Sequence, residues 1–95
     1  MKIKLEDARK SNEQGWEVRL SGDYEGSKPY FERAAKIKGA IARRMSFCFD
    51  KVLALQSAMI NYALADNEAM ADFYSKKWYA AHDKWDSLRD ILGQS

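Results

Sequence analysis

The chain contains few of the residues from which metal, disulfide and nucleophilic sites are built. Its 95 residues include one cysteine, one histidine and one proline. A single cysteine cannot form an intramolecular disulfide, which suits a reducing compartment. The spacings typical of zinc sites and of phosphate-binding loops are also missing. We therefore expect no metal, no cofactor and no enzymatic activity.

Two sets of side chains are the remaining candidates for catalysis. Cys48 lies on an apolar helix stripe and His82 at the edge of a polar face, whereas a nucleophile pair needs an accessible thiolate beside the imidazole. Asp83, Asp86 and Asp90 share one helix face, for which a solvated acidic surface is the ordinary explanation. Neither set shows the arrangement that catalysis requires, so we assign no catalytic residue.

Long apolar runs are absent too. No segment approaches the roughly 20 apolar residues of a membrane span, and the first ten residues lack the apolar region of a signal peptide. The chain is 46% apolar and 32% charged, as globular chains usually are. The sequence therefore predicts one domain over residues 1–95 and a cytoplasmic location.

The N-terminal region alternates in two short runs. Residues 2–5 and 16–20 switch between apolar and polar side chains, a period typical of β-strands. The polar segment between them suits a loop. We predict a short β-hairpin within residues 1–26, and a short helix over residues 5–14 is the alternative.

A long helix is predicted to follow. Ser27 is a suitable N-cap, and Pro29 is tolerated in a first helical turn. Apolar residues then recur every three or four positions, which predicts a helix over residues 29–65 with Gly39 as its only interior weak point. The apolar arc of this helix is wide, so we expect it to contact more than one neighbouring element.

A second helix is predicted over residues 67–92, with Asp66 or Asn67 as its cap and Gly93 at its end. Matched apolar stripes and a short corner indicate an antiparallel pair. The predicted fold class is mainly α (α+β): a long antiparallel two-helix hairpin with the short N-terminal β-hairpin packed on it. Any apolar surface left uncovered on the longer helix is a predicted homo-oligomer interface.

Positive charge is concentrated in the middle of the chain. Residues 28–65 hold seven cations and two acids, and at 100° per residue most of these cations share one arc with an aromatic side chain. Lys38 falls in the apolar stripe instead, where it must extend to solvent, pair with an acid or meet a partner. The predicted partner-binding residues are Arg33, Lys36, Lys38, Arg43, Arg44, Phe47 and Lys51.

Three interpretations fit this basic and aromatic face. It is a solvated helix surface, a protein-binding surface, or a surface that binds nucleic acid through phosphates. The net charge of only +2 and the lack of a nucleic-acid-binding motif weigh against the last. We predict a small inhibitor or adaptor, as viral accessory proteins often are, whose protein partner has an acidic or nucleic-acid-binding surface. A component of the nucleic-acid-processing machinery is one candidate for this partner. Sequence-independent nucleic-acid binding is the alternative.

Overall fold

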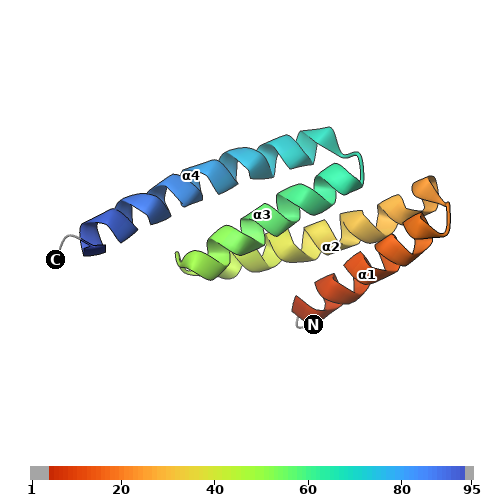
Figure 1. Cartoon of the computed structure of the whole chain (residues 1–95), viewed down its shortest axis with the longest axis horizontal. Coiled ribbons are helices and arrows are strands. Elements are labelled where there is room, and N and C mark those ends of the chain that lie inside the picture. The colour runs from red at the N-terminus through yellow and green to blue at the C-terminus, as the bar shows by residue number, and fades with distance from the viewer. Residues whose placement is uncertain (1–4, 94–95) are drawn as a thin grey trace.

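The computed structural model describes residues 5–93, which form four α-helices and no strand (Figure 1). Each helix runs antiparallel to the one before it, and the helices pack mainly in consecutive pairs. The helices are α1 (Leu5–Leu20), α2 (Tyr24–Arg44), α3 (Phe49–Leu64) and α4 (Glu68–Gly93).

The predicted β-hairpin over residues 1–26 is wrong. Residues 5–20 form helix α1, and α2 begins already at Tyr24. Residues 1–4, which belonged to the first predicted strand, lie outside the described residues. The alternative, a helix over residues 5–14, is correct in secondary-structure type, but the observed helix continues to Leu20. Over its described part the fold is all-α, not α+β.

Packing against α2 explains why the alternating segment is helical. A Cβ on Gly15 would lie 3.0 Å from the Phe31 ring, so the glycine lets the two helices approach closely. Phe31 is fully buried, and Trp16 meets it edge to face with ring centroids 5.2 Å apart. The buried face of α1 consists of small residues at helical spacing: Ala8, Ser11 and Gly15.

The predicted helix over residues 29–65 is in fact two antiparallel helices, so the two-helix hairpin is also wrong. α2 ends at Arg44, Met45 is extended, and α3 begins at Phe49. No glycine or proline marks this break, and the apolar pattern continues through it. The chain turns back because the two helices bury small side chains against each other. These include Ala35, Ala42, Ala54 and Ala58.

The polar caps show where two of the helices begin. Asp23, not Ser27, caps α2, because its carboxylate accepts a backbone N–H bond of 2.8 Å. Asn67, one of the two caps that the sequence predicted, accepts a 3.2 Å bond from the first turn of α4. The predicted helix over residues 67–92 agrees with α4.

Helix α4 covers one side of the α2–α3 hairpin. Tyr74, which is 5% exposed, stacks on Tyr62 with ring centroids 5.6 Å apart. The hydroxyl of Tyr74 reaches Gly39, where a Cβ would collide with it. α4 has 26 residues and α3 has 16, so the C-terminal part of α4 extends beyond the hairpin (Figure 1). No helix within residues 5–93 is both long and apolar enough to cross a membrane.

A polar cluster ties the α3–α4 corner to the start of α2. Lys28 Nζ lies 2.9 Å from carboxylate oxygens of both Glu25 and Asp66, and the Tyr24 hydroxyl donates to Asp66 at 3.1 Å. The hydrogen bond from Lys28, and then that from Tyr24, lowers the pKa of Asp66 below its ordinary value. The bonds to Glu25 and Asp66 raise the pKa of Lys28.

Candidate functional site

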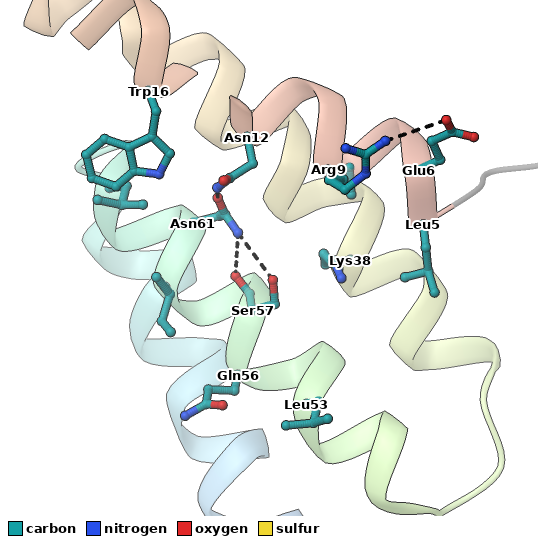
Figure 2. A pocket seen from close by; sticks show the side chains of 13 residues that line it. Leu5, Glu6, Arg9, Asn12, Trp16, Lys38, Leu53, Gln56, Ser57 and Asn61 are labelled. Atoms are coloured by element: carbon teal, nitrogen blue, oxygen red, sulfur yellow. Dashed lines mark hydrogen bonds and ion pairs between the residues drawn. The ribbon is translucent and has the colours of Figure 1, made fainter. Parts of the chain in front are cut away.

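A groove of about 800 Å³ runs between α1 and α3 (Figure 2). α1 forms one wall, α3 forms the other, and Lys38 of α2 lies between them at the floor. The walls are largely apolar, and several large side chains on them are 41–55% exposed. These side chains are Leu5, Trp16, Leu53 and Ile60.

The apolar wall on α3 follows from the composition of that helix. Residues 52–65 contain no charged side chain. Leu55 and Tyr62 bury one side of α3 in the core, whereas Leu53 and Ile60 lie on the opposite side and line the groove. A helix that is apolar on both sides is typical of a helix covered on both sides. Here the described chain fully covers only one of them.

Polar contacts join the two walls near one end of the groove. The side-chain amide of Asn12 donates to Asn61 Oδ1, and Asn61, which is 4% exposed, donates to the Ser57 carbonyl at 2.8 Å. Just beyond them, Arg19 Nη2 donates to the Leu64 carbonyl at 2.7 Å. These bonds join α1 to α3, so the two walls are held at a fixed separation at this end.

The charges on the groove are balanced at the rim and unbalanced at the floor. Arg9 lies on the rim, where it pairs with Glu6 at 3.7 Å and with Glu13 at 2.8 Å. Lys38 is half-buried, and its ammonium forms no ion pair or hydrogen bond with the side chains of residues 5–93. The sequence had placed Lys38 in an apolar stripe, and the structure puts it on the floor of an apolar groove.

The other predicted partner-binding residues lie outside this groove. Arg33, Lys36, Arg43 and Arg44 are exposed on α2. Lys36 pairs weakly with Glu32, at 3.9 Å and with both side chains well exposed. The structure therefore separates Lys38 from the remaining cations of its own helix.

Phe47 is partly covered by α4. Its ring lies 6.4 Å from that of Trp85, and the Lys84 ammonium sits 4.4 Å from its centroid. Phe49 also contacts Trp85, with centroids 5.4 Å apart. The link between α2 and α3 therefore packs on α4 through an aromatic cluster, in which Phe47 is half-buried.

A second depression, of about 230 Å³, gathers three cations from three helices. Arg43 of α2, Lys51 of α3 and Lys77 of α4 line it, and no acidic residue does. Lys51 also donates to the Met45 carbonyl at 3.2 Å. Lys77 was not predicted, because only the packing of α4 on the hairpin brings it beside the other two. We call this site the basic depression.

The histidine and the cysteine of the candidate nucleophile pair lie on different elements of the fold. His82 Nδ1 lies 3.3 Å from Asp86 on its own helix, and Cys48 is half-buried in the link before α3. No group of three His, Cys, Asp or Glu side chains in that range is arranged to hold a metal ion.

No protein-family model matches the chain, and the comparisons with curated proteins and with solved structures gave no match either. The function must therefore be inferred from the chemistry of the groove and of the basic depression.

Proposed function

We propose that the protein is a non-enzymatic interaction protein, of the inhibitor or adaptor type, that binds a protein partner in the groove between α1 and α3. One observation carries the proposal: Leu53 and Ile60 are 45% and 46% exposed on α3, within the uncharged segment of residues 52–65. Protein-binding sites typically combine an apolar centre with a polar rim. Glu6 and Arg9 provide such a rim.

The groove is also suited to binding because it is already formed. The bond between Asn12 and Asn61, and the bond from Arg19 to α3, fix α1 against α3 without a partner. A preformed site loses less conformational entropy when it binds. A partner therefore meets an ordered apolar surface.

The basic residues outside the groove have a separate role in this proposal. Charges outside the contact area mainly change the rate of association, because they steer a partner of opposite charge. Arg33, Lys36, Arg43, Arg44 and Lys51 would attract a protein with an acidic face, as a component of nucleic-acid-processing machinery can have. Their effect should weaken with added salt.

Affinity capture from the native host tests the proposal. The bait is the wild-type chain, the groove variant Ile60→Glu, or the control Ile91→Glu, which alters a 64% exposed isoleucine on α4. We expect a protein that the wild type and Ile91→Glu retain and that Ile60→Glu loses while its circular dichroism stays helical. Equal retention by all three baits would contradict the proposal.

Nucleic-acid binding is the second candidate, and the basic depression favours it. Arg43, Lys51 and Lys77 meet there without an acid, and such clusters bind phosphates with strong salt dependence. An oligonucleotide should then be retained at low salt, and less so by the Arg43→Ala, Lys77→Ala double variant. Failure to retain any oligonucleotide at low salt would eliminate this candidate.

A further inference from the structure

We infer that the groove between α1 and α3 receives an amphipathic α-helix of the partner, which places one Asp or Glu carboxylate on Lys38. The inference rests on the proposed function and specifies the chemistry of the partner. It follows from the shape of the walls and from the charge on the floor.

The walls favour a helix over an extended peptide. One common way to bind an extended peptide is to add it to the edge of a sheet, and residues 5–93 contain no strand. The groove instead presents side chains of three helices. On the other side of the α2–α3 hairpin the chain itself supplies the covering element, and that element is helix α4. A helix in the groove would cover the open side in the same way.

The spacing of the wall residues sets the length of this helix. Leu53 and Ile60 are seven residues apart on α3, which is roughly 10 Å along a helix. Leu5 and Trp16 lie on the opposite wall. The occupant therefore needs apolar side chains over at least two turns, at spacings of three or four residues.

The floor selects an acidic residue in that apolar stripe. A wholly apolar helix would cover the half-buried Lys38 and leave its charge without a partner, which is unfavourable. A carboxylate would pair with it in a charge-assisted hydrogen bond. Gln56 and Ser57 line the groove as well, and their side chains add N–H and O–H donors without adding charge. The rim cation Arg9 is already balanced by Glu6 and Glu13, so the demand for an acid is specific to the floor.

Selection from a displayed peptide library tests this inference. The library consists of amphipathic helices of about five turns, in which one position within the leucine stripe is varied among all amino acids. Selection is run in parallel on the full chain as wild type, Lys38→Met and Lys38→Glu. On the wild type we expect Asp and Glu at the varied position to be enriched at least about tenfold over Asn and Gln. The preference should disappear on Lys38→Met and change to Lys and Arg on Lys38→Glu.

Two further variants locate the binding. The selected helices should lose at least about tenfold in affinity for Ile60→Glu and keep their affinity for Ile91→Glu. If helices depend on Ile60 but show no preference for an acid, the inference is wrong and the proposed function stands. If helices bind Ile60→Glu as tightly as the wild type, the groove is not the site, and both are wrong.

Other occupants would also overturn the inference. Selection of extended peptides only, from an unstructured library run beside the first, would exclude a helical occupant. Light scattering on the chain alone tests whether a second copy of the chain fills the groove. Self-association that Ile60→Glu abolishes and Ile91→Glu does not would show that the groove is filled by another copy of this chain instead of a separate partner.

Discussion

The two sides of α3 are both apolar, but only one of them is closed. On the closed side, α4 covers Leu55 and Tyr62, whereas on the open side Leu53 and Ile60 remain about half exposed. Neighbouring residues of α2 mark the difference. Gly39 makes room for the Tyr74 hydroxyl on the closed side, and the next residue back along the chain, Lys38, puts a cation on the floor of the open side.

This comparison separates surface that stabilises the fold from surface available for binding. The closed side removes apolar area from water within the chain, which stabilises the protein. The open side has similar side chains on the same helix but no covering helix. Substitutions on the two sides should therefore have different consequences, for stability on one and for binding on the other.

The largest expected effect comes from truncating one leucine on each side. Leu55→Ala should lower the free energy of unfolding by about 2–5 kcal/mol, because it leaves a cavity in the core. Leu53→Ala should lower it by less than about 1 kcal/mol, because Leu53 is 45% exposed. Urea denaturation of both variants measures the difference. Equal losses would mean that the open side is as much a part of the core as the closed side.

The close approach of α4 can be disturbed at a single glycine. Gly39→Ala should lower the free energy of unfolding by about 1–3 kcal/mol, because the new methyl group collides with the Tyr74 hydroxyl. Gly93→Ala is the matched control, since a Cβ there meets nothing within 4 Å. If thermal denaturation shows Gly39→Ala to be as stable as the wild type, the packing of α4 described above is wrong.

Lys38 should contribute little to the stability of the free protein. Lys38→Met should leave the free energy of unfolding unchanged or raise it by up to about 1 kcal/mol, because it removes a half-buried charge that has no counter-ion among residues 5–93. Lys36→Met, on the exposed face of α2, provides the comparison. A loss of more than about 1 kcal/mol in Lys38→Met alone would show that this lysine holds the fold together.

The smallest effect is expected at the α3–α4 corner, and it depends on pH. The pKa of Asp66 is lowered from 3.8 in the folded chain, so its stabilising contribution is fully present above pH 3.8 and is lost as the pH falls through the lower, folded value. Asp66→Asn should therefore lose stability relative to the wild type at neutral pH, and the gap should narrow in acid. Asn tolerates the left-handed conformation of this residue, φ 57°.

Removing the partner of Asp66 checks the cause of this pH dependence. In a chain that already carries Lys28→Met, Asp66→Asn should cost less stability at neutral pH. The hydrogen bond from Lys28 is the main reason for the lowered pKa of Asp66. Chemical denaturation at several acidic pH values gives both curves. If the difference in stability between the wild type and Asp66→Asn does not change with pH, the ion pair between Lys28 and Asp66 is not its source.

The sequence predicted those features that depend on local chemistry. A cap at Asp66 or Asn67, the extent of α4 and a wide apolar arc that includes α3 can all be recognised from residue type and spacing. The break between α2 and α3 was missed because residues 45–48 contain neither glycine nor proline. It exists because the two helices bury their alanines against each other, which is a contact between distant residues.

The groove was missed for a related reason. The sequence predicted a wide apolar arc, to which Leu53 and Ile60 belong, and Lys38 as a cation within the apolar stripe. The sequence could not predict that these residues line one groove together with α1, because residues 16–20 were interpreted as a strand. The small residues on α1, and Gly15 above all, were the overlooked signal of a helix that packs closely on another.

The central claim is that the open side of α3 is a binding surface, and nuclear magnetic resonance tests it directly. A helix selected on the wild type is added to the isotope-labelled chain, and the methyl and indole signals are followed. We predict shifts at Trp16, Leu53 and Ile60, with Leu88 and Ile91 of α4 unchanged. Shifts confined to α4 or to the basic depression, with Leu53 and Ile60 unaffected, would contradict the claim.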